Sequence, residues 1–236
     1  LAPAAAPAVG DAWKDPRGPC VYSYTTDLTA RRPATLRHIS AGGRALFYVT
    51  DDVWSGFQRV LSARSDLWAT FDSYLEGTIL AGRNDGARRI LPALHEAFGQ
   101  ESDVDGNGQL VFLFADLGAD PGSGGFVVGY FDGTDVVRAA DTTDGCTGGR
   151  SNGADLLYLL DPCTFYRRGF NPVAASCPTT GDGSTSNYPY PKYLYPTSID
   201  SQLPGTMAHE LQHNVLFNTR CLAASLPSCS VIDQPT

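Results

Sequence analysis

A glutamate and two histidines near the end of the chain have the spacing HExxH, as His209, Glu210 and His213. Histidines four residues apart project from the same face of a helix, so both imidazole rings can reach a single ion. Zinc prefers such nitrogen ligands and, in catalytic sites, keeps one position for a water molecule. The carboxylate of Glu210 can take a proton from that water as it attacks a carbonyl carbon. The motif therefore predicts zinc-assisted hydrolysis, with His209 and His213 as metal ligands and Glu210 as the catalytic base.

Coincidence is the alternative explanation, and it predicts HExxH in roughly one chain of this composition in a thousand. The surrounding sequence favours a helix over Thr206–Phe217. Asp200 or Ser201 can cap this helix, and Pro204 and Gly205 suit its start more than its middle. Three apolar residues at helical spacing would face the core, with the histidines off that face: Met207, Leu211 and Val215.

A third protein ligand is expected, because catalytic zinc sites use three. A metzincin would continue HExxHxxGxxH, but Leu216 and Thr219 occupy the glycine and third-histidine positions. The other common solution is a glutamate on a following helix, yet no glutamate follows Glu210, and the others lie far upstream: Glu76, Glu96 and Glu101. Either Asp233 is an unusual ligand, or the ligand lies beyond Thr236, which is the expectation adopted here.

Five stretches carry a family resemblance: TLRHISAGGRALFYVTDD, AFGQESDVDGNGQLVFLFADL, GGFVVGYFDGTD, SNGADLLYLLDP and GTMAHELQHNVLF. In this combination and order, from about Ala34 to Phe217, the chain resembles the hyicolysin family of secreted bacterial zinc metallopeptidases, in the thermolysin-like gluzincin group. The resemblance implies a twisted mixed sheet with helices and zinc on His209 and His213. It also implies Glu210 as the base, and a third ligand, a glutamate, on a helix soon after the motif. It places residues 20–236 in a catalytic domain truncated before its C-terminal part.

A second candidate metal site lies in DVDGNGQLVFLF. Asp103, Asp105 and Asn107 occupy positions 1, 3 and 5 of an EF-hand-like loop, and Gly108 occupies position 6. Position 12 is Phe114 in place of the usual glutamate, and a strand follows the loop. Calcium is therefore a candidate cofactor beside zinc, and an Asp/Asn/Gly turn that closes a hairpin is the alternative.

The formal net charge of −8 argues against nucleic acid and anionic membranes as partners, because both need a basic patch. No apolar run approaches the length of a membrane span. We expect protein or peptide substrates and a monomer. The GGFVVGYFDG segment could form an edge strand that pairs with an extended peptide, the alternative being an ordinary core strand.

Six cysteines predict a secreted, extracellular protein with disulfides, and buried thiols in a cytosolic enzyme are the alternative. The short-loop pairings would be Cys163 with Cys177 and Cys221 with Cys229.

The hydrophobic pattern predicts an α+β fold. Strands are expected from Cys20 and within Arg44–Asp52, Leu110–Phe114 and Phe126–Phe131, with a strand or short helix within Ala154–Pro162. Helices are expected within 65–80, with Ser65 or Asp66 as cap, and within 86–99, where Gly99 ends the helix and Pro92 fits only the first turn.

Residues 163–197 would form a long loop, and residues 1–19 a flexible segment or linker. His38 and His95 are expected to be structural.

Three functional classes fit these observations. The first is a secreted zinc endopeptidase. The second is a non-catalytic exported pseudo-protease or binding module, which the missing third ligand favours. The third is an inactive, clipped fragment of the protease.

Overall fold

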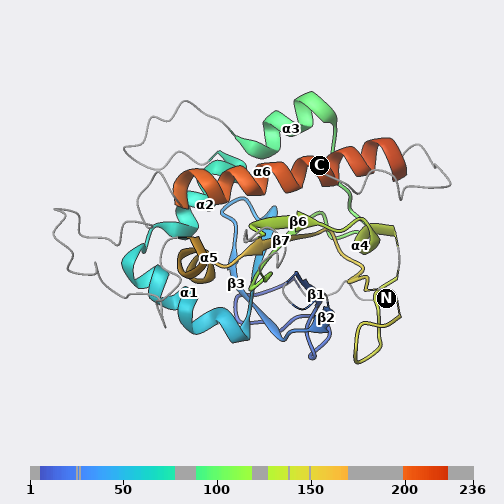
Figure 1. Cartoon of the computed structure of the whole chain (residues 1–236). Coiled ribbons are helices and arrows are strands. Elements are labelled where there is room, and N and C mark those ends of the chain that lie inside the picture. Colours follow the sequence, from blue (N-terminus) through green and yellow to red (C-terminus); the bar gives the residue numbers. More distant parts are fainter. Residues whose placement is uncertain are drawn as a thin grey trace.

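A five-stranded mixed sheet forms the centre of the protein (Figure 1). The computed structural model describes residues 6–24, 26, 28–77, 89–118, 127–137, 139–148, 150–169 and 199–222. The strand order is β3 (Ala34–Ile39), β4 (Ala45–Thr50), β5 (Leu110–Ala115), β7 (Leu156–Leu160) and β6 (Gly129–Phe131). The three central strands run parallel, and β3 and β6 are antiparallel edge strands. A separate hairpin pairs β1 (Cys20–Ser23) with β2 (Leu28–Arg31). The predicted α+β class is confirmed.

The longest helix, α6 (Ile199–Phe217), lies over β6 and β7, with α3 (Ile90–Phe98) packed against it (Figure 1). A π-helical turn continues it over Asn218–Leu222. The remaining helices are α1 (Asp51–Ala63), α2 (Leu67–Glu76), α4 (Thr134–Val137) and α5 (Pro162–Gly169). The side of the sheet away from α6 faces the β1–β2 hairpin (Figure 1).

Every residue of the central strands β4, β5 and β7 is buried, because both faces of the sheet are covered. On the helix-covered face, Phe47, Phe112 and Phe114 pack with apolar residues of α1, α2 and α6. On the other face, Tyr48 and Tyr158 pack with residues that include Trp13 and Val21. Because both faces of these strands are buried, the strands appear in the sequence as continuous apolar runs.

Residues 10–13 belong to the segment predicted to be a flexible linker, and they lie against β3. Trp13 is 6% exposed, and its backbone N–H donates to the carbonyl oxygen of Ala34 at 2.9 Å. Ala12 forms an isolated antiparallel bridge with Thr35. These described residues therefore extend the outer edge of the sheet.

One predicted helix start and one predicted capping contact need correction. The helix carrying HExxH begins at Ile199, so Asp200 and Ser201 lie inside it and Pro204 is an interior residue. An interior proline removes one backbone hydrogen bond and crowds the carbonyl oxygen four residues before it, and the complete burial of Leu203 helps to offset this cost. Asp66 is the N-cap residue of α2 but makes no capping hydrogen bond, and its carboxylate instead pairs with Arg64.

The predicted loop over residues 163–197 is also wrong at its start, where α5 occupies Pro162–Gly169. Its proline stands at the first helical position, which suits proline. The helix α3 agrees with prediction, because Pro92 falls in its first turn and Gly99 follows its last residue.

Disulfides occur in the structure, as the cysteine content predicted. Cys20 of β1 is bonded to Cys146. Cys163 and Cys221 are also disulfide-bonded. The predicted partners Cys177 and Cys229 lie outside the described residues, so these pairings stay predictions. Within the described ranges, no helix is long and apolar enough to cross a membrane.

The two remaining histidines contact carboxylates away from HExxH, in keeping with the predicted structural roles. His38 Nε2 lies 2.9 Å from Asp72 Oδ1, and its ring stacks on Trp68. His95 is hydrogen-bonded to Glu101.

Asp161 caps α5 directly after β7. Its Oδ1 accepts hydrogen bonds from the backbone N–H groups of Cys163 and Thr164 at 3.0 and 3.1 Å, whereas Oδ2 has no hydrogen-bond partner. Burial raises the pKa of this carboxyl to about 7. The native state therefore keeps a proton that the unfolded chain releases at about pH 4, so its contribution to stability is lost as pH rises from about 4 to about 7.

Asp161→Asn is expected to make this decline in stability shallower. At pH 8 the variant should be more stable than the wild type by about 2–4 kcal/mol, and at pH 4 the two should unfold alike. Urea unfolding measured at several pH values between 4 and 8 tests this. The partly exposed Asp52 supplies the matched control Asp52→Asn, which should keep the full decline. An unchanged decline in Asp161→Asn would contradict the assignment.

Candidate metal centre

The amphipathic pattern of α6 places the HExxH side chains. Met207, Leu211 and Val215 are fully buried against the sheet, as predicted. His209 lies on the exposed side of the helix and His213 is partly buried. The burial of the apolar face therefore turns both imidazole rings away from the core.

The two rings meet at their outer nitrogens. His209 Nε2 and His213 Nε2 are 3.1 Å apart, and the ring planes are 88° apart. Two nitrogens bound to one tetrahedral zinc at 2.0–2.1 Å are separated by about 3.3 Å. Burial, followed by the nearby His209, lowers the pKa of His213, which favours the neutral ring that metal binding needs. The pair therefore fits two zinc ligands.

Glu210 projects from the same turn toward the edge strand β6. Its side chain is only 6% exposed, and its carboxylate accepts a hydrogen bond from the backbone N–H of Phe131. Burial raises the pKa of Glu210 to about 7, and the hydrogen bond opposes this only in part. A carboxyl with this pKa can both take and return a proton near neutral pH.

An open pocket of about 380 Å³ lies between α6 and the β6 segment. Its lining comes from both elements: Val128, Gly129, Gln202, Gly205, Thr206, His209 and Glu210. One histidine and the glutamate of the motif therefore face the same space.

Gly129 allows β6 to approach α6 closely. A methyl group on this residue would lie 2.6 Å from Thr206 Cγ2, 2.9 Å from the carbonyl oxygen of Tyr158 and 3.3 Å from Glu210 Cγ. Gly129→Ala is therefore expected to push the helix away from the strand. We expect the free energy of unfolding, measured in urea, to fall by about 1–3 kcal/mol.

Gly205 provides the matched control, since a methyl group on it would meet nothing within 4 Å. Because Gly205 lies inside α6, Gly205→Ala should leave stability unchanged or raise it by up to about 1 kcal/mol. Equal behaviour of the two variants would show that the close approach at Gly129 is unimportant.

A third ligand for the histidine pair is not found among the described residues. There, the only group of three acidic, histidine or cysteine side chains close enough to share an ion lies elsewhere, as described below. Glu76 accepts hydrogen bonds from Ser40 and Gly42, and Glu101 pairs with Arg44. Asp233 lies outside the described residues, so both sequence-based alternatives for the third ligand stay open.

Tyr24 is a neighbour of the site that the sequence did not predict. Its ring packs edge-on against Tyr130 of β6 at 5.9 Å between centroids. Burial raises the pKa of Tyr24, and the charges of Glu210 and Asp132 raise it further. The phenol therefore lies in the electric field of Glu210. In the sequence, this tyrosine looks like any other residue of a strand that begins at Cys20.

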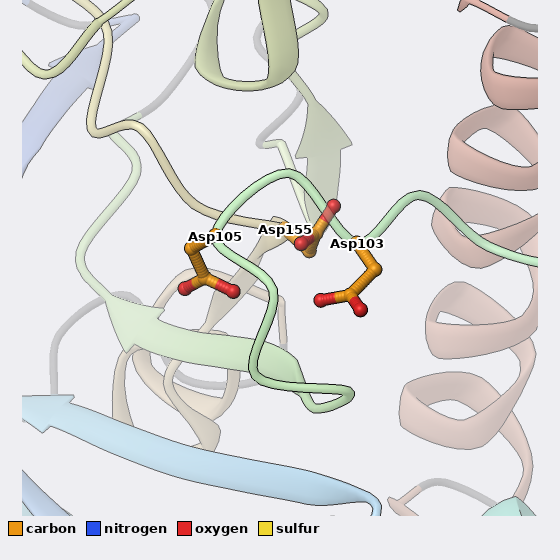
Figure 2. A group of neighbouring side chains, drawn as sticks. All are labelled: Asp103, Asp105 and Asp155. Atoms are coloured by element: carbon orange, nitrogen blue, oxygen red, sulfur yellow. The ribbon is translucent and has the colours of Figure 1, made fainter. Parts of the chain in front are cut away.

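The second candidate metal site keeps two of its predicted residues, Asp103 and Asp105, and gains Asp155. Asp103, Asp105 and Asp155 offer carboxylate oxygens within 4.8 Å of one another (Figure 2). Asn107 is instead part of the turn, because its Nδ2 donates to Asp105 and its Oδ1 accepts from the backbone of Gln109. Asp155 precedes β7 and lies far away in sequence. Calcium binding stays a prediction, and Asp155 is a further acidic side chain beside Asp103 and Asp105.

No protein-family model matches the chain, and no curated protein matches it. The resemblance to the hyicolysin family is therefore untested by relatives and stays a hypothesis.

Proposed function

We propose that this protein is a secreted zinc endopeptidase that hydrolyses peptide bonds. The observation that carries the proposal is the 3.1 Å separation of the Nε2 atoms of His209 and His213, beside the buried Glu210. When bound, zinc would polarise a carbonyl oxygen and lower the pKa of a coordinated water to about 7.

The edge strand β6 supports a peptide as substrate. Among the described residues it pairs with β7 on one side only, and its own residues are partly exposed. An extended peptide can add to such an edge through main-chain hydrogen bonds, which favours peptides over other amides. Since Val128 and Gly129 line the same pocket as His209 and Glu210, the added peptide would pass the site.

Each residue of the motif has a distinct role in this proposal. His209 and His213 would hold the metal through Nε2. Glu210 would accept a proton from the attacking water on its carboxylate and return it to the amine that leaves. The Phe131 N–H keeps the carboxylate directed at β6, where the scissile bond would lie.

Zinc content tests the proposal first. Elemental mass spectrometry of the 236-residue chain and of the full-length gene product is expected to find about one zinc per chain in the longer form, by the rule of one ion per catalytic site. Weaker retention by the shorter form would place the third ligand after Thr236. Absence of zinc from both forms would overturn the proposal.

A non-catalytic pseudo-protease or binding module is the second candidate. The absence of a third ligand among the described residues favours it. Casein cleavage by the full-length gene product separates the two, because a binding module would retain peptides without cutting them. An inactive clipped fragment would instead differ in intact mass from the gene product.

A further inference from the structure

A buried polar side chain interrupts the apolar face of α6 directly after His213. Asn214 is fully buried. Its Oδ1 accepts a hydrogen bond from the backbone N–H of Ser102 at 3.0 Å, and its Nδ2 donates to Ser102 Oγ at 2.8 Å. One serine therefore satisfies both ends of the amide.

The hydrogen bonds continue from Ser102 into the sheet. The Ser102 hydroxyl donates to Asp155 Oδ1, and the other oxygen of Asp155 accepts the backbone N–H of Val104 at 2.9 Å. Ser102 is 3% and Asp155 1% exposed. Because Asp155 directly precedes β7, the network joins the helix to the start of a central strand.

A second contact is made one turn further along. Asn218 Nδ2 donates to the carbonyl oxygens of Gln100 and Glu101, both at 3.0 Å. Because Gly99 has no side chain, the backbone at this residue can lie close to the turn that carries Asn218. A methyl group on Gly99 would lie 2.8 Å from Thr219 Cγ2. We call Asn214, Asn218, Ser102 and Asp155 the α6 clamp.

Such a network selects one position of the helix. Apolar packing is non-directional, and Met207, Leu211 and Val215 alone would tolerate small rotations or shifts. A buried amide or hydroxyl left without its partner costs about 1–3 kcal/mol, so only one rotation and one axial position satisfy the clamp. Successive helix residues are about 100° apart, so a modest rotation would redirect His213.

We infer that the α6 clamp positions the metal ligands, by fixing the rotation and axial position of α6 at the residue beside His213. This inference rests on the proposed zinc site. The clamp residues are positioning residues, because they act through the helix and do not touch the site.

Ser102→Ala tests the inference, with Val215→Ala as the control. The first removes the hydroxyl shared by Asn214 and Asp155, and the second removes buried apolar volume from the same helix. Zinc affinity is measured by competition with a chelator, and the free energy of unfolding is measured in urea on the same variants. Ser102→Ala should weaken zinc binding by about tenfold or more, as loss of orienting partners does in other metal sites. Val215→Ala should leave zinc affinity unchanged although it lowers stability.

Ser102→Thr keeps a hydroxyl and should recover most of the zinc affinity. If Ser102→Ala does not fold, Asn218→Ala replaces it, since Asn218 is only partly buried and its loss removes the two hydrogen bonds to Gln100 and Glu101. Equal zinc affinity in the clamp variant and in Val215→Ala would overturn the inference and leave the clamp a purely structural network.

Metal-free spectra separate this inference from the proposed function. If the wild-type chain binds no zinc, the proposed function fails, but the ring ¹H–¹⁵N spectra of His209 and His213 still decide the role of the clamp. Ring signals that shift in the clamp variant and not in Val215→Ala support positioning. Ring signals that stay unchanged in both variants overturn it.

Discussion

Glu210→Gln is expected to keep zinc and to lose peptidase activity by about 10²- to 10⁴-fold, the usual worth of a general base. Glutamine has nearly the shape of glutamate, and its carbonyl oxygen can still accept the hydrogen bond from Phe131. Its amide cannot take a proton from water at neutral pH. The loss should therefore appear in kcat more than in KM, because the change removes a step of the reaction and leaves the proposed peptide-binding edge of β6 intact.

The matched control is Glu96→Gln on α3, where the glutamate is exposed. It makes the same chemical change away from the pocket and should leave activity unchanged. Peptide hydrolysis and zinc content are measured together on the full-length gene product. Activity retained in Glu210→Gln would remove this residue from the base role, whereas joint loss of zinc and activity would assign it to metal binding.

Phe47→Ala should cause the largest loss of stability among these variants. Phe47 is fully buried at the centre of β4, and its ring packs on three other phenylalanines: Phe71, Phe112 and Phe114. Removing a buried phenylalanine side chain costs about 3–5 kcal/mol, through lost burial and the cavity left behind. A loss of this size is comparable to a large part of the stability of a typical domain.

Leu28→Ala is the control for this variant, because Leu28 is 65% exposed on β2. Its free energy of unfolding should change by no more than about 0.5 kcal/mol. Urea unfolding followed by tryptophan fluorescence measures both, since Trp68 lies 5.7 Å from the Phe47 ring and reports on this core. A loss below about 1 kcal/mol in Phe47→Ala would mean that the aromatic cluster repacks around the cavity.

Periodicity predicted the parts of the fold that depend on neighbouring residues. The buried runs around Phe47 and Phe112 form strands as expected. The apolar spacing of α6 correctly predicted that His209 and His213 face away from the core. Helix starts were less predictable. Pro204 looked like a first-turn residue, yet the helix extends upstream of it.

Long-range partners could not be read from the sequence. Nothing near Asp103 indicates Asp155 as its neighbour, because the strand order that joins them is a property of the whole sheet. The same is true of Ser102 and Asn214, which are 112 residues apart. The approach of Gly129 to Glu210 likewise depends on how a helix and an edge strand pack, and local spacing carries no information on that.

The place of α6 in the chain bears on when the proposed activity can arise during biosynthesis. The described strands of the sheet all precede this helix in sequence, and its buried face and its clamp contact residues far upstream, such as Phe112 and Ser102. Contacts between residues so far apart form late, because their loop-closure entropy must first be offset. An emerging chain would therefore fold its sheet before α6 brings both histidines into place, so the proposed peptidase would stay inactive until then.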